Sequence, residues 1–247
     1  MSTEKKSKRQ ERREKLRSQT QRNRLVTIGL ISLGAVFLVV AVVVSQKKSV
    51  ENIITVTQAS LPNADGLTLG DPNATVSVDV FEDFQCPACQ LFTNNIEPLI
   101  IQNLITPGKA KYTFHNYPFL DGDSVKNGGE SDQAANASMC ANEQGKFWDM
   151  HSIIFANWNG ENLGSLSNRR LEAMAESIGL DMTAFNNCFD ANKYEEKIQA
   201  DFTYGQDLGV SGTPSVFVNG ARVGQPGRIA SYQEIAEAVD LAFNAAQ

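Results

Sequence analysis

The stretch Phe84-Gln85-Cys86-Pro87-Ala88-Cys89-Gln90 decides how we interpret this chain. Its C-P-A-C motif follows an apolar strand pattern and precedes a helical one. Two cysteines separated by two residues can close a disulfide with little chain movement, and a thiol in the first turn of a helix has its thiolate stabilised by unpaired N–H groups. A structural crosslink or half of a zinc site are the alternatives. Zinc needs about four Cys or His ligands, and the sequence has two histidines far along the chain and no second C-x-x-C. We therefore predict thiol–disulfide chemistry and no metal.

The residues around this motif predict a β-α-β unit. Residues 75–81 alternate between apolar and polar side chains, with the period of a strand. Pro87 suits the first position of a helix, where its missing N–H is not needed. Pro98 is expected to kink or end that helix, and residues 110–114 read as a second strand.

The remainder of the chain predicts a helical block followed by a β-β-α unit. Residues 131–208 show helical spacing of their apolar positions. Residues 214–218 read as a strand, Asn219-Gly220 as a hairpin turn, and 221–223 as the returning strand. Ser231 is expected to cap the last amphipathic helix.

The N-terminal region predicts a membrane anchor. Residues 1–24 hold ten Lys/Arg and three Glu, a net charge of +7, although the whole chain of 247 residues carries −6. We expect this basic tail to lack structure. Residues 25–45 are free of charge and long enough to cross a bilayer, and longer than the apolar part of a cleaved signal. The basic flank predicts a cytoplasmic tail and an exported remainder: a linker at 46–60 and one globular domain at 61–247.

The order of these elements resembles the thioredoxin fold carrying a helical insertion, and more closely the DsbA-like thiol–disulfide oxidoreductases. The similarity rests on Phe81-Glu82-Asp83-Phe84-Gln85-Cys86-Pro87-Ala88-Cys89, on Gly145-Lys146-Phe147-Trp148-Asp149-Met150-His151, and on Gly209-Val210-Ser211-Gly212-Thr213-Pro214-Ser215-Val216-Phe217-Val218-Asn219-Gly220. The implied architecture is α/β, a thioredoxin fold (β-α-β … β-β-α) with an inserted helical subdomain at about 120–208 and one transmembrane helix before it.

The resemblance also implies the roles of the site residues. Cys86 would be the nucleophile and Cys89 the resolving cysteine. The Thr213-Pro214 bond would be cis and face the Cys86 sulfur, with the Thr213 backbone pairing with an extended substrate peptide; the alternative is a trans proline that opens an edge strand. Thioredoxin has a buried carboxylate six residues before its first active-site cysteine, where this chain has Val80.

Two carboxylates and two histidines are further candidates for proton transfer. Glu82 and Asp83 lie near the motif, but we expect loop carboxylates to be solvated, so a proton-relay role for either is only an open alternative. His115 and His151 are interpreted as packing residues and not as bases.

If Cys86 pairs with Cys89, the other two cysteines, Cys140 and Cys188, are left to pair with each other. DsbA-like relatives have cysteines at the corresponding places, which implies a structural Cys140–Cys188 disulfide. Two buried free thiols remain the alternative.

The sequence and the resemblance together predict a membrane-anchored, extracytoplasmic protein-disulfide oxidoreductase without a cofactor. Its expected substrates are cysteines of exported proteins, and its expected recycling partner is a quinone-linked membrane protein. A reductase or isomerase of the same fold is one rival hypothesis, because the direction depends on the reduction potential. A dithiol metal carrier is a rival of another class.

Overall fold

The computed structural model describes residues 8–48, 52–57, 60–122 and 128–247, and it divides into a first unit, Met1–Glu51, and a second, Asn52–Gln247. The first unit contains one helix, α1 (Lys8–Lys48). Within it, Gln21–Val42 is long and apolar enough to cross a membrane, with a mean hydropathy of 2.7. The large apolar side chains of this segment are exposed within the unit. Our expectation of an unstructured tail was wrong from Lys8 onward, because Glu, Lys, Arg and Gln are good helix formers that extend the apolar helix.

The second unit is built from a five-stranded sheet and helices. Its strands are β1 (Thr68–Leu69), β2 (Ser77–Glu82), β3 (Lys111–Asn116), β4 (Ser215–Val218) and β5 (Ala221–Val223). Its α-helices are α2 (Pro87–Asn95), α3 (Glu97–Ile100), α4 (Glu130–Asn142), α5 (Phe147–Asn157), α6 (Asn168–Ser177), α7 (Met182–Phe189), α8 (Glu195–Asp207) and α9 (Tyr232–Ala245), with a π-helical turn at Ile101–Ile105 and a 3₁₀ turn at Phe119–Asp121.

The strand order β1-β3-β2-β4-β5 places β2, which leads to the C-P-A-C motif, at the centre. β2 and β3 are parallel, whereas the other neighbouring strands are antiparallel. Val80 lies opposite Phe114 on one side and Val216 on the other, and all three are buried. The β-α-β and β-β-α units are thus joined in one sheet, and the predicted thioredoxin fold is confirmed. The short edge strand β1 was missed, because two residues carry no detectable alternation.

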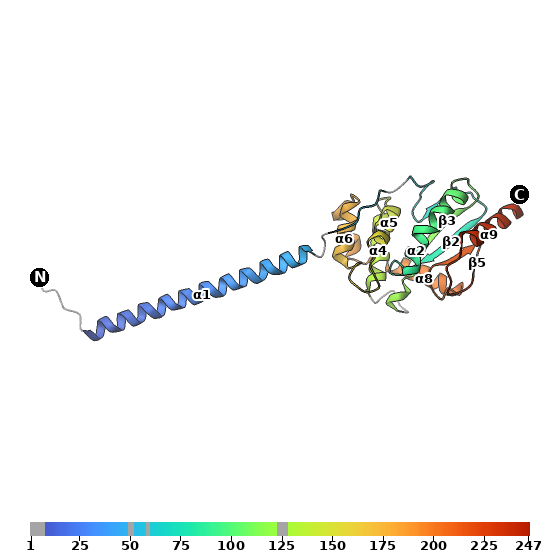
Figure 1. Cartoon of the computed structure of the whole chain (residues 1–247). Helices are drawn as coiled ribbons and strands as arrows, with labels where there is room; N and C mark the ends of the chain where they lie inside the picture. Colours follow the sequence, from blue (N-terminus) through green and yellow to red (C-terminus); the bar gives the residue numbers. More distant parts are fainter. Residues whose placement is uncertain (1–7, 49–51, 58–59, 123–127) are drawn as a thin grey trace. The chain divides into compact units, whose positions relative to one another are not determined.

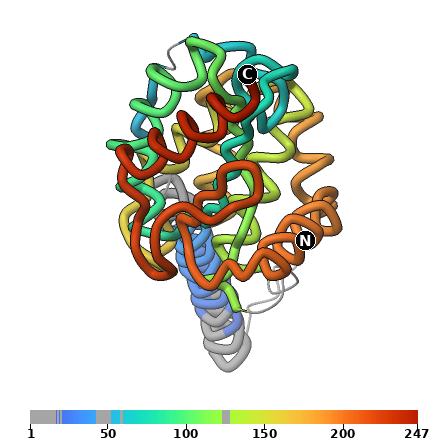
Figure 2. The backbone as a smooth tube through the Cα atoms, turned by 90° about the vertical axis from the view of Figure 1, so that its right-hand side faces the viewer, coloured from blue at the N-terminus to red at the C-terminus, as the bar shows by residue number. Residues whose placement is uncertain are grey.

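Helices cover both faces of this sheet (Figure 1). α9 packs on β4 and β5 and contacts α3, so α3 and α9 lie on one face. In Figure 2, α9 is the dark red helix that ends at the C-terminus. On the other face, Phe81 of β2 and Phe217 of β4 join a second apolar cluster with Ile198 and Phe202 of α8. β2 is therefore buried on both sides, which fixes the position of the loop that follows it.

The helical block lies between β3 and β4 in sequence, as predicted, and a disulfide crosslinks it. α4 packs against α5, α6 and α7. Cys140 of α4 and Cys188 of α7 form the disulfide, with Cα atoms 5.8 Å apart. The pairing expected from the resemblance is present in the structure, and it closes a loop of 48 residues.

The ends of several elements also depart from or refine the predictions. The helix after the motif ends at Asn95, and Pro98 lies in the first turn of α3. Ser231 caps α9 in a capping box with Glu234, as expected. Part of the predicted linker belongs to the globular unit, because Asn157 of α5 donates to the Ile54 carbonyl at 2.9 Å and accepts from its N–H at 2.8 Å.

The disulfide generates a prediction about stability. In a full-length Cys86→Ser/Cys89→Ser chain, a reductant should lower the free energy of unfolding by about 2–4 kcal/mol, because the open 48-residue loop gains entropy in the unfolded state. Denaturant unfolding with and without dithiothreitol measures the change. Adding Cys140→Ala and Cys188→Ala should remove the effect of the reductant, and a persisting effect would contradict this assignment.

Candidate active site

The loop after β2 places Cys86 at the N-terminus of α2. Cys86 is the N-cap residue and Pro87 follows at the start of the helix, as predicted. The Cys86 N–H donates to the Asp83 carbonyl at 3.0 Å, and the Gln90 N–H donates to the Cys86 carbonyl at 3.1 Å. The cysteine is thus held at both of its backbone groups, and its side chain faces the free N–H groups of the first helical turn.

The two sulfurs of the motif lie in different environments, and both cysteines are free thiols in the structure. Cys86 is 6% exposed and Cys89 is fully buried. The hydrogen bond from the Cys89 thiol lowers the pKa of Cys86 to about 6, helped by Thr213 and by the N–H groups of Ala88 and Cys89, against the opposing effect of burial. Burial raises the pKa of Cys89 well above its ordinary value. At neutral pH, Cys86 is therefore the thiolate and Cys89 the thiol.

The Thr213-Pro214 segment lies against the Cys86 sulfur, although it is 127 residues away in sequence. The Cys86 thiol donates to the Thr213 carbonyl at 3.3 Å. The bond between Thr213 and Pro214 is cis, as the resemblance implied. Pro214 offers no N–H, so the Thr213 carbonyl and side chain are the polar groups that this segment presents to the sulfur.

The expectation of solvated loop carboxylates was wrong, because Glu82 and Asp83 are each 1% exposed. The Asp83 carboxyl accepts from Ser131 Oγ at 2.6 Å, from the Gln85 N–H at 2.8 Å and from the Leu120 N–H at 3.0 Å. Burial nevertheless raises the pKa of Asp83 to about 7. The carboxyl therefore serves as the hydrogen-bonding centre of the active-site loop.

Gln85, the residue before the nucleophile, joins this loop to the helical insertion. Its amide donates to Asp121 Oδ1 and to Ser131 Oγ, both at 3.0 Å, and its carbonyl oxygen accepts from the Asn162 N–H at 2.6 Å. We did not predict this network from the sequence. The available signal was that Asp83 and Gln85 alternate with Phe84 next to the motif.

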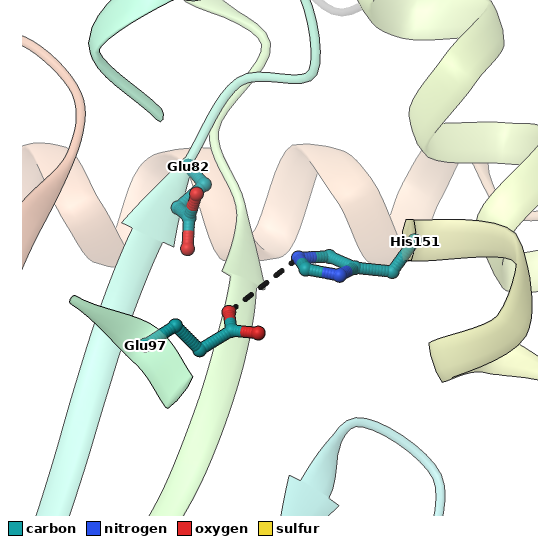
Figure 3. A group of neighbouring side chains, drawn as sticks. All are labelled: Glu82, Glu97 and His151. Atoms are coloured by element: carbon teal, nitrogen blue, oxygen red, sulfur yellow. Dashed lines mark ion pairs between the residues drawn. The ribbon is translucent and has the colours of Figure 1, made fainter. Parts of the chain in front are cut away.

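Glu82 belongs to a second buried cluster, together with Glu97 and His151 (Figure 3). Side chains alternate along a strand, so Glu82 points to the same face as Val78 and Val80. There it meets Glu97 of α3 and His151 of α5, with ligand-type atoms of all three within 4.8 Å of one another. By composition and spacing, these three side chains are the described residues that could hold a metal ion.

The two histidines differ in their surroundings. His151 is fully buried among aromatic rings, including those of Phe84, Phe114 and Phe155, in agreement with its interpretation as a packing residue. His115 stacks on Phe81, but its Nε2 also lies 3.0 Å from an Asp79 oxygen. Neither histidine is among the side chains that hydrogen-bond Cys86.

Comparison with known proteins agrees with this site. A model of the thioredoxin family matches residues 63–238. A probable disulfide bond formation protein D of Bacillus anthracis is 29% identical over 211 residues, which cover 80% of this chain and 89% of that protein. The oxidised structure of BdbD from Bacillus subtilis superposes with a TM-score of 0.64 and 25% identity, covering 75% of this chain and 97% of that one. DsbA of Chlamydia trachomatis, at 21% identity and a TM-score of 0.59, shares the fold over 79% of this chain and 97% of its own.

The fold and the dithiol at the helix N-terminus define a thiol–disulfide oxidoreductase. The chain belongs to the thioredoxin family, to its DsbA-like branch, and is a protein-disulfide oxidoreductase.

The lowered pKa of Cys86 predicts a titration and a pH-dependent stability. Thiolate absorbance of the reduced chain should rise with a midpoint near pH 6, and Cys86→Ala should abolish that transition. Because the folded thiol loses its proton before the unfolded one, the reduced chain should gain stability as pH rises from about 6 towards 9, and lose it as pH falls through 6. Unfolding curves across this pH range measure the change in stability. A midpoint of the thiolate absorbance near pH 9 would contradict the lowered pKa of Cys86.

Proposed function

We propose that this chain is a membrane-anchored oxidase that introduces disulfides into exported proteins. The observation that carries the oxidising direction is the contrast between the two thiols, with a Cys86 pKa of about 6 beside a Cys89 pKa raised by burial. A stabilised Cys86 thiolate stabilises the reduced enzyme, and therefore makes its disulfide a stronger oxidant. The names of the Bacillus relatives, disulfide bond formation protein D, agree with this direction for those proteins.

The proposed location rests on α1. Its segment Gln21–Val42 has the length and hydropathy of a single membrane span. The basic residues on its N-terminal side favour retention of that end in the cytoplasm, which places the catalytic unit outside. The Cys140–Cys188 disulfide also supports an extracytoplasmic location, because disulfides persist in oxidising compartments.

The geometry supports a two-step exchange. A substrate thiolate attacks the Cys86 sulfur of the oxidised pair, which forms a mixed disulfide and breaks the Cys86–Cys89 bond. The second substrate thiolate attacks its own sulfur in the mixed disulfide, and Cys86 leaves as a thiolate stabilised by its hydrogen bonds. The Thr213 backbone, beside this sulfur, is placed to pair with the substrate main chain. A quinone-linked membrane partner would then restore the disulfide.

Trapping tests the two cysteine roles. Cys89→Ser should accumulate mixed disulfides with exported proteins through Cys86, because the Cys86 thiolate can still attack a disulfide of such a protein and no Cys89 thiol remains to displace it. Non-reducing gels of the membrane fraction measure these adducts. Cys86→Ser is the matched control and should accumulate almost none; equal trapping by both variants would contradict the assigned roles of the two cysteines.

The reduction potential tests the direction. Equilibration of the full-length chain with glutathione buffers should give a potential near the oxidising end of the family range, about −120 mV, because the thiolate stabilises the reduced state. A potential near about −270 mV, typical of thioredoxin, would favour a reductase. Cys140→Ala/Cys188→Ala should leave the measured potential unchanged, since that disulfide lies outside the site.

A further inference from the structure

The segment that presents Thr213 to the Cys86 sulfur is short and contains two glycines. It runs from Gly209, just after α8, to Ser215, the first residue of β4. Gly209 has a φ of 74°, in the left-handed region, and Gly212 has no side chain that could pack against a neighbour. The backbone alone therefore does little to hold this segment, and contacts from surrounding side chains must supply its rigidity.

Side chains hold the segment at three of its carbonyl oxygens. The acceptors are the carbonyls of Gly209, Val210 and Gly212, and their donors are Arg222, Tyr117 and Ser215, at 2.8, 2.8 and 2.7 Å in that order. The backbone of Thr213 differs, because its N–H has no hydrogen-bond partner among the described residues and its carbonyl meets the Cys86 thiol. The residues around Thr213 are thus held within the fold, and the backbone groups of Thr213 are left for a substrate.

Arg222 contacts both ends of the segment. Its Nη2 donates to the Gly209 carbonyl at the start, and its Nη1 donates to Ser215 Oγ at the end, at 3.0 Å. The same hydroxyl donates in turn to the Gly212 carbonyl, so one guanidinium secures residues before and after Thr213. Hydrogen bonds from a charged donor are stronger than those between neutral groups. Arg222 therefore holds the segment more firmly than a neutral side chain would.

The hairpin between β4 and β5 fixes where Arg222 lies. Asn219 and Gly220 at its turn have positive φ values of 48° and 79°, as a tight two-residue turn requires. This turn sets the register that places Arg222 opposite Phe217, and the guanidinium carbon lies 4.8 Å from the centre of the Phe217 ring. Side chains two residues apart on a strand share a face, so Ser215 lies on that face too. The arginine thus reaches the segment from the edge strand of the sheet.

We propose that Arg222 is a positioning residue for disulfide exchange, and that it holds the Thr213 backbone beside the Cys86 sulfur for pairing with a peptide substrate. Its hydrogen bonds to Gly209 and Ser215 form a clasp across the segment. The clasp rests on the proposed pairing of Thr213 with the substrate main chain. It does not depend on the direction of exchange or on the membrane location.

A fixed segment favours the binding of a peptide. An extended substrate adds to an existing backbone edge through main-chain hydrogen bonds. Without the clasp, the glycine-containing segment would have to become ordered in the complex, and this ordering would weaken binding. Dithiothreitol has no peptide backbone, so it reacts at Cys86 without this pairing. Loss of the clasp should therefore slow exchange with a peptide far more than exchange with dithiothreitol.

Reduction of the oxidised full-length chain in detergent tests the clasp. The reductants are a reduced peptide with two cysteines and dithiothreitol; each gives two electrons to the Cys86–Cys89 bond and becomes a disulfide itself. The two single-turnover rates give a peptide-to-dithiothreitol ratio for each variant. Arg222→Ala should lower this ratio about 10-fold, because a displaced positioning group can cost up to about 10²-fold in rate. A variant that only loosens the fold should change both rates together and keep the ratio.

Three further variants sharpen the test. Arg228→Ala is the matched control, because Arg228 pairs with Glu234 of α9, and it should keep the wild-type ratio. Ser215→Ala removes the hydroxyl that Arg222 shares with Gly212, so Arg222→Ala should have a smaller effect in that background. If thermal melts show that Arg222→Ala fails to fold, Arg222→Lys should lower the ratio instead, because lysine keeps the charge but lacks the planar fork.

A second peptide separates the clasp from the pairing on which it rests. This peptide carries N-methyl groups on the backbone nitrogens beside its first cysteine, so these nitrogens cannot donate to the Thr213 carbonyl. The wild type should react more slowly with the methylated peptide, and Arg222→Ala should lose most of this preference. A wild type that reacts equally with both peptides would overturn the pairing and the clasp together. A reduction potential near that of thioredoxin would overturn only the oxidising direction.

Two results would overturn the clasp alone. One is a folded Arg222→Ala chain that keeps the wild-type ratio and the wild-type preference for the unmethylated peptide. The other is full additivity of the Arg222→Ala and Ser215→Ala effects on the ratio, because two groups joined in one clasp should not act independently.

Discussion

The rest of the site depends on the unequal burial of two sulfurs one helical turn apart. The Cys89 thiol, the Thr213 side chain and the N–H groups of the helix N-terminus stabilise negative charge on Cys86, whereas burial beneath α2 disfavours it on Cys89. One dithiol therefore contains a good leaving group and a poor one. The central position of β2, covered on both faces, makes this difference possible because it holds the motif at the boundary between core and solvent.

The helical insertion contributes to the active site as well as to the size of the domain. Ser131 at the start of α4 and Asn162 before α6 hold the loop residues Asp83 and Gln85. These bonds fix the backbone immediately before Cys86. A change at Ser131 or Asn162 is thereby transmitted to the nucleophile through a few short hydrogen bonds.

Much of the fold was predictable, because periodicity reports burial and the motifs report backbone geometry. The dithiol and the capped last helix each rest on local chemistry that a sequence displays, whereas the cis bond at Thr213-Pro214 was expected from the resemblance to a family. The buried carboxyls were not predicted, since solvation of Glu82 and Asp83 depends on what α4 and α5 place over them. Yet the alternation that put Val78 and Val80 in the core also placed Glu82 there, and following it one step further would have predicted its burial. The contact of Glu82 with Glu97 and His151 could not be predicted, because it depends on how β2, α3 and α5 pack together.

The Cys140–Cys188 crosslink has a consequence for how each molecule matures. Both sulfurs are buried in the folded domain, at 1% and 4% exposure, and they lie on α4 and α7. The active site of the same chain has no access to them once folding is complete. A newly made chain must therefore acquire this bond while its insertion is still open, from an oxidant outside itself. If earlier copies supply that oxidant, the enzyme is among its own substrates, and its accumulation would be self-accelerating.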